Sequence, residues 1–109
     1  MPVVVLVAPP LTDSAADLAA ASAVAVAIAD ALTLRAEDVY VTLSPTRMAV
    51  LGTKPVRPWP VVLIHGRRRA TEAAALEAAR AAAAAAWDAP LDEVWVQWVG
   101  ADPVPRPGH

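Results

Sequence analysis

The sequence contains no cysteine, and this absence removes several classes of chemistry. Disulfide bonds, thiolate nucleophiles and cysteine-based metal sites are all excluded. The chain also lacks a glycine-rich phosphate-binding loop, the serine and histidine arrangement of a hydrolase, and the paired carboxylates of a glycosidase. Because no second histidine stands at ligand spacing from His65, we expect neither a metal nor another cofactor.

An excess of charge of one sign is also lacking, since nine basic and eleven acidic residues give a formal net charge of −2. We therefore expect neither nucleic acid nor a membrane surface as a partner. We also expect no apolar stretch to be long enough to span a bilayer. No basic segment precedes an apolar one as in a secretion signal, so a cytoplasmic protein is expected.

Apolar residues, in contrast, are abundant: they make up 57% of the 109 residues, against about 45–50% in typical soluble domains. A chain of this length is expected to form a single domain, over residues 1–109, with one core. The surplus of apolar surface predicts an interface with another subunit.

The order of apolar and alanine-rich segments predicts an α/β fold. Four apolar, β-rich runs predict strands over residues 3–7, 39–43, 60–66 and 94–99. Two alanine-rich segments predict helices, the first following Thr12 or Asp13 as N-cap and ending near Leu32, the second over residues 71–87. Residues 48–59 contain a glycine and two prolines and predict a connecting segment.

The two halves of the chain resemble each other. Pro2 corresponds to Pro60 at an offset of 58, and each half begins a strand with proline and contains a valine–aromatic–valine triplet in its second strand. We interpret residues 2–47 and 60–99 as duplicated βαβ units. Right-handed crossovers then place two helices on one face of a mixed four-stranded sheet. We expect a partner subunit to cover the other face.

Four short motifs carry a resemblance to a known family: Met1-Pro2-Val3, HGRRR (65–69), WDAPLDEVWV (87–96) and AEDVYVTLSPTR (36–47). In their order along two βαβ units they resemble the tautomerase superfamily, which includes 4-oxalocrotonate tautomerase, malonate semialdehyde decarboxylase and cis-3-chloroacrylic acid dehalogenase. The resemblance implies a tautomerase-like fold, an N-terminal proline that acts as a base or acid, and arginines that hold a substrate carboxylate. It also implies a homotrimer in which three sheets form a barrel.

Pro2 is the first candidate catalytic residue. Removal of Met1 would free a secondary amine, and an α-amino group titrates close to neutral pH. An apolar pocket and nearby arginines both disfavour the ammonium form, so the pKa falls and the amine is a suitable base for a proton next to a carbonyl. The alternative is a strand-starting proline with Met1 retained.

Arg67, Arg68 and Arg69 are the candidate substrate-binding residues. A guanidinium pairs with a carboxylate through two hydrogen bonds, and a helix N-terminus favours anions. A solvated basic loop is the alternative, but three cations oppose the dipole of the helix that follows.

The resemblance adds Asp38, at the position of an aspartate that assists the proline; a solvated loop acid is the alternative. His65 is interpreted as structural.

These residues predict a tautomerase or isomerase that acts on a small carboxylate-bearing keto or enol substrate. The alternatives are a decarboxylase or hydratase that uses Asp38, and a non-catalytic trimer that keeps Met1. Dehalogenation is disfavoured, because Gln97 stands where the dehalogenase has a tyrosine.

Overall fold

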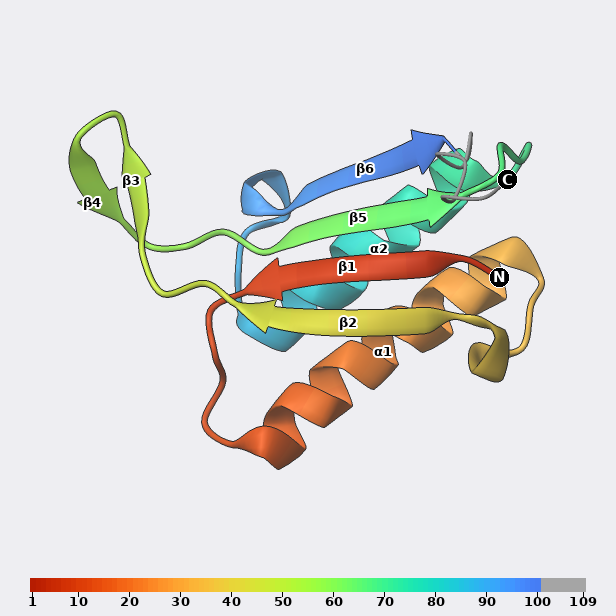
Figure 1. Cartoon of the computed structure of the whole chain (residues 1–109), viewed down its shortest axis with the longest axis horizontal. Coiled ribbons are helices and arrows are strands. Elements are labelled where there is room, and N and C mark those ends of the chain that lie inside the picture. Colours follow the sequence, from red (N-terminus) through yellow and green to blue (C-terminus); the bar gives the residue numbers. More distant parts are fainter. Residues whose placement is uncertain (101–109) are drawn as a thin grey trace, which may run out of the picture.

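The computed structural model describes residues 1–100 of the chain. Its main sheet has the order β2-β1-β5-β6, and both helices lie on the same face of that sheet (Figure 1). The strands are β1 (Val3–Ala8), β2 (Tyr40–Pro45), β5 (Val61–Gly66) and β6 (Trp95–Gly100), and the helices are α1 (Ser14–Leu32) and α2 (Glu72–Trp87). Every predicted strand and helix is present, with ends within two residues of the prediction.

The sheet is mixed, as predicted, because its central pair is antiparallel and its outer pairs are parallel. β1 pairs with β2 in parallel and with β5 in antiparallel orientation, and β5 pairs with β6 in parallel. Each half of the chain follows the same order of strand, helix, short 3₁₀ helix and strand. The two 3₁₀ helices are η1 (Ala36–Asp38) and η2 (Leu91–Glu93).

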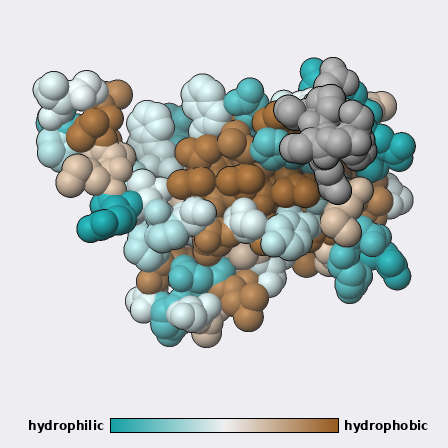
Figure 2. All heavy atoms as spheres, viewed as in Figure 1, coloured by the Kyte–Doolittle hydropathy of each residue, from teal (hydrophilic) through white to brown (hydrophobic). Residues whose placement is uncertain are grey.

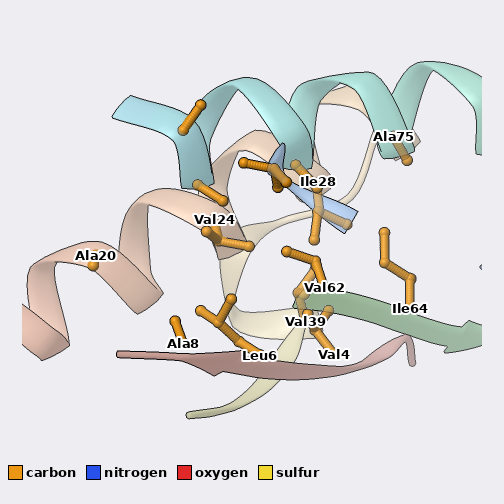
Figure 3. Packing of buried hydrophobic residues seen from close by; sticks show 14 of the residues in the cluster. Val4, Leu6, Ala8, Ala20, Val24, Ile28, Val39, Val62, Ile64 and Ala75 are labelled. Atoms are coloured by element: carbon orange, nitrogen blue, oxygen red, sulfur yellow. The ribbon is translucent and has the colours of Figure 1, made fainter. Parts of the chain in front are cut away.

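The core lies between the sheet and the helices. Alternate residues of β1 point toward the helices, and Val4, Leu6 and Ala8 are fully buried there. They meet Val62 and Ile64 of β5 from the neighbouring strand (Figure 3). Since successive strand residues point to opposite faces, the continuous apolar runs also leave valines on the other side of the sheet.

Helix α1 begins and ends with identifiable caps. The carboxylate of Asp13 accepts a hydrogen bond from the Ala16 backbone N–H at 2.8 Å, which satisfies one free donor of the first turn. Thr33 adopts a left-handed conformation, with φ of 57°, and ends the helix. Of the two predicted caps, Asp13 and not Thr12 fills the position.

The expectation about membrane-spanning stretches is wrong for α1. This helix is long and apolar enough to cross a membrane by length and composition, although 28% of its most apolar window is buried inside the structure. The expectation failed because alanines and valines lie on every side of this helix, so its average hydropathy is high and it has almost no polar face. In the structure, Val24 and Ile28 of this helix are fully buried in the core.

The predicted connecting segment over residues 48–59 has regular structure of its own. This segment contains a β-hairpin made of β3 (Ala49–Leu51) and β4 (Lys54–Val56), which stands away from the main sheet (Figure 1). Gly52 lies in its turn with φ of 66°, a conformation that glycine adopts without steric cost. Both strands have three residues, and Pro55 falls inside one of them, so the sequence pattern favoured a loop.

The face of the sheet opposite the helices is apolar. Figure 2 looks onto this face and shows hydrophobic side chains gathered along its centre. Along β1 and β5, buried residues that point toward the helices alternate with residues that point to the opposite face. The residues on this opposite face are Val3, Val5, Val7, Val61 and Leu63. This chain alone therefore leaves a contiguous apolar surface exposed or only partly covered.

Candidate active site at one end of the sheet

Pairing of the central strands brings the start of the chain to the end of β5. Val3 lies opposite His65 in the antiparallel pair, and it lies beside Tyr40 in the parallel pair with β2. The backbone N–H of Tyr40 donates to the carbonyl oxygen of Pro2 at 3.1 Å. Pro2 is thus flanked by the end of β5 and the beginning of β2, on the side of the sheet where Figure 1 marks the N-terminus.

The side chain of Pro2 is fully buried, whereas Met1 before it is 82% exposed. With Met1 attached, the nitrogen of Pro2 belongs to an amide and has no basic lone pair. Gly66 is a close neighbour, since a β-carbon built on it would lie 3.9 Å from the α-carbon of Pro2. Loss of the exposed methionine would therefore create an amine in a position that is already packed by protein.

The three predicted arginines follow β5 directly, on the loop that leads into α2. Arg68 forms an ion pair with Glu72 at 3.1 Å, and the second carboxylate oxygen of Glu72 accepts from the backbone N–H of Arg69 at 3.4 Å. Arg67 is exposed and Arg69 is half-buried. The Nε atom of Arg69 is buried and has no hydrogen-bond partner among the described residues.

Glu72 changes the electrostatic interpretation of this loop. Three cations at a helix N-terminus are unfavourable, and an acidic residue in the first turn offsets part of that cost. Because Glu72 neutralises Arg68, the positive charge available to an anion comes mainly from Arg67 and Arg69. The spacing of Arg68 and Glu72, four residues apart, is the signal by which sequence analysis could have found this pair.

Asp38 ends η1, just before β2, and its carboxylate is held by Arg35. The Arg35 guanidinium contacts both carboxylate oxygens, at 3.3 Å and 3.4 Å. The hydrogen bond from Arg35 is the largest cause of a lowered pKa of Asp38, and the positive N-terminus adds a smaller effect in the same direction. Asp38 is therefore a carboxylate within electrostatic reach of the chain start. Sequence analysis missed Arg35.

Two further residues near Pro2 have distinct surroundings. His65 is exposed and lies on the strand beside Val3. Within residues 1–100, no group of three or more histidine, aspartate or glutamate side chains is placed to hold a metal ion. Trp98 is buried in the core, and its indole N–H donates to the carbonyl oxygen of Gly66 at 3.1 Å.

No protein-family model matches the sequence, and no curated protein matches it at a significant level. Solved structures do match. F6 fused 4-OT, a wild-type asymmetric trimer, superposes with a TM-score of 0.80 at 23% identity, over 91% of this chain and 85% of that one. Pt0534, inactivated by 2-oxo-3-pentynoate, gives a TM-score of 0.79 at 15% identity, over 97% and 92%.

Macrophage migration inhibitory factor from Toxoplasma gondii gives a TM-score of 0.73 at 18% identity, over 98% of this chain and 97% of that one. A member of the cis-3-chloroacrylic acid dehalogenase family is also similar. These proteins all belong to the tautomerase superfamily. The matches span nearly the whole chain, and the predicted fold is confirmed. The chain has the fold of the tautomerase superfamily.

Proposed function

We propose that this protein, after removal of Met1, is a tautomerase or isomerase in which the amine of Pro2 is the general base. Its substrate is a small keto or enol compound that carries a carboxylate. The observation that supports this most strongly is the meeting of Pro2 and the arginine loop at one end of a tautomerase-type sheet. The similar structures are tautomerase-superfamily proteins, which supports enzymatic activity without specifying the reaction.

The surroundings of Pro2 favour a neutral amine. Burial disfavours a charged ammonium, and the neighbouring arginines disfavour it as well. Both effects lower the pKa of the amine, so more of it is unprotonated at neutral pH. A base of this kind can remove a proton from carbon next to a carbonyl.

The arginines supply binding and charge stabilisation. Arg67 and Arg69 hold the substrate carboxylate, since Glu72 already neutralises Arg68. The buried Nε of Arg69, which has no partner among residues 1–100, is a donor that such a carboxylate satisfies. Arg68, the third predicted substrate-binding residue, pairs with Glu72 and contributes less than the other two.

The reaction is a proton transfer within one molecule. The Pro2 nitrogen takes a proton from a carbon or an enol oxygen, and the electrons move into the conjugated system. The resulting prolinium returns the proton to a different atom of the substrate. No atom is gained or lost, and the amine is regenerated.

A homotrimer fits the apolar face of the sheet. Fused 4-OT proteins of similar structure are described as trimers. The valines and Leu63 that face away from the helices need cover, and three copies arranged around a common axis supply it. The cytoplasm is the proposed location.

A decarboxylase or hydratase is the second candidate, and Asp38 favours it. Its carboxylate lies within electrostatic reach of the N-terminus. In this candidate, Asp38 orients a water molecule for the Pro2 amine. This candidate predicts release of carbon dioxide from malonate semialdehyde and a large loss of that activity in Asp38→Asn. A tautomerase loses little activity in the same variant.

The decisive test uses 2-oxo-3-pentynoate, which offers a carboxylate to the arginines and an electron-poor alkyne to an amine. Addition of the Pro2 nitrogen to the alkyne forms one carbon–nitrogen bond, and the amine proton moves to the neighbouring carbon. Intact mass first establishes loss of Met1, and peptide mapping then locates the label. We expect one label per chain, on Pro2.

Turnover is measured with phenylenolpyruvate and 2-hydroxymuconate. We expect Pro2→Ala to lower kcat/KM by about 10²-fold or more, the range of general base catalysis. Pro60→Ala is the matched control, since Pro60 is also buried at a strand start but carries an amide nitrogen. Turnover that survives Pro2→Ala, or a native chain that keeps Met1, would overturn the proposal.

A further inference from the structure

Trp98 links the last strand to the end of β5. Its register partner on β5 is Ile64, yet its indole N–H donates to the carbonyl oxygen of Gly66, two residues further along, at 3.1 Å. The side chain is only 7% exposed. The indole therefore lies along β5 on the helix side of the sheet and is fixed at the residue that precedes the arginines.

Gly66 lies between the indole of Trp98 and Pro2. A β-carbon built on Gly66 would lie 3.4 Å from Cζ2 of Trp98, and 3.9 Å from the α-carbon of Pro2. The six-membered ring of Trp98 and Pro2 thus border the same position on β5. A larger residue at 66 would press against the ring.

The arginine loop also rests on the end of β6. A β-carbon built on Gly100 would lie 3.8 Å from Cδ of Arg68. β6 therefore borders this region at two positions: the indole of Trp98 contacts Gly66, and Gly100 lies near the side chain of Arg68.

We propose that Trp98 is a positioning residue, which fixes the carbonyl of Gly66 and thereby holds the arginine loop at the right place beside Pro2. This inference rests on the proposed function for its chemical consequence. The indole N–H orients the peptide that leads into Arg67, and the ring gives Pro2 an apolar neighbour. The two contributions are separable, because phenylalanine keeps a ring and loses the N–H.

The first experiment needs no substrate. Hydrogen exchange of the Arg69 backbone amide, which donates to Glu72 at 3.4 Å, is measured in wild type, in Trp98→Phe and in Trp95→Phe. Trp95 is the matched control, because it lies on the same strand but is 58% exposed. We expect exchange of this amide to be about tenfold faster in Trp98→Phe, since the Gly66 carbonyl loses its donor. The amides of α1 and the whole of Trp95→Phe are expected to match wild type.

The second experiment follows labelling by 2-oxo-3-pentynoate. In Trp98→Phe we expect the concentration for half-maximal labelling to rise about five- to tenfold, while the maximal rate stays within about twofold, because carboxylate binding and not the amine is affected. In Trp98→Ala we expect the pH midpoint of labelling to rise as well, because the apolar ring beside Pro2 is lost.

Exchange of the Arg69 amide that is unchanged in Trp98→Phe, or equally fast in Trp95→Phe, would overturn the positioning role. An equal loss of labelling affinity in Trp98→Phe and in the control Trp95→Phe would also overturn it. Absence of labelling in wild type that has lost Met1 would instead refute the proposed function, and the exchange result would still decide the role of Trp98.

Discussion

We expect Glu72 to stabilise the fold and to weaken the binding of a carboxylate substrate. The variant Glu72→Gln separates these two effects. Its carboxylate pairs with Arg68 at 3.1 Å and accepts from the Arg69 backbone at 3.4 Å, in the first turn of α2. Glutamine keeps the shape and an accepting oxygen but removes the charge. The charge stabilises the helix end, and the same charge weakens the field that attracts a carboxylate substrate.

The expected loss of stability is modest. An acidic group near a helix N-terminus contributes about 0.3–1 kcal/mol, and a partly exposed ion pair about 0.2–1 kcal/mol. The free energy of unfolding should therefore fall by about 1 kcal/mol, which corresponds to about 4 °C in Tm for a chain of this size. Urea denaturation at low salt measures it, and high salt should reduce the difference.

Binding should change in the other direction. With Arg68 released, the affinity for 2-oxo-3-pentynoate should rise by about 1.4- to fivefold, the equivalent of one exposed ion pair. Glu77→Gln is the control, because Glu77 lies one turn along the helix and pairs with Arg80 at 3.7 Å. Weaker binding in Glu72→Gln, or an equal loss of stability in both variants, would show that Glu72 mainly shapes the loop and does not neutralise it.

Three further changes test the fold and its charges. Ile28→Ala should lower the free energy of unfolding by about 2–5 kcal/mol in urea titration, because a fully buried side chain leaves a cavity, whereas Leu18→Ala, at a 69% exposed position, should change it little. Arg57→Ala should cost about 1–2 kcal/mol, because its guanidinium donates at 2.9 Å and 3.2 Å to two carbonyls at the end of α2. The pair of Arg35 and Asp38 stabilises the fold above the unfolded carboxyl pKa of about 3.9 and loses this effect as pH falls through the lower folded value. Arg35→Ala should return the Asp38 midpoint, followed by carbon NMR, toward the ordinary range; an unchanged midpoint would contradict this.

The strands and helices were predictable because each has a strong local signal. The continuous valines of β1 and the turn residues on both sides fix its place, and an alanine-rich run of 16–19 residues has few alternatives to a helix. The β3–β4 hairpin was not predictable in the same way. Each of its strands has only three residues, and β4 contains Pro55. Its pairing therefore depends on backbone geometry more than on side-chain pattern.

The candidate site was predictable in its residue types and not in its contacts. Pro2, Asp38 and the arginines were identified from motifs, but no local pattern states that β1 and β5 pair in antiparallel orientation. That pairing alone places position 2 beside position 66. The indole of Trp98 under Gly66 depends on yet another strand, so it could be found only in three dimensions.

The two halves of the chain have the same order of elements, so the two ends of the sheet can be compared directly. The backbone N–H of Trp95 donates to the carbonyl oxygen of Pro60 at 3.0 Å, as Tyr40 does to Pro2. Yet the loop after β1 carries Pro9-Pro10-Leu11 where the loop after β5 carries Arg67-Arg68-Arg69. The hollow beside that first loop, about 460 Å³, is lined by prolines, Leu43 and Asp17.

The two ends thus share a backbone and differ in chemistry. Pro60 lies within the chain, so its nitrogen is always an amide, and no cation stands after β1 to hold an acid substrate. A proline at a strand start is explained by the fold at both ends. Removal of Met1 can create an amine only at the Pro2 end, next to the arginine loop. Under the proposed function, processing of this one residue therefore determines whether the protein is active.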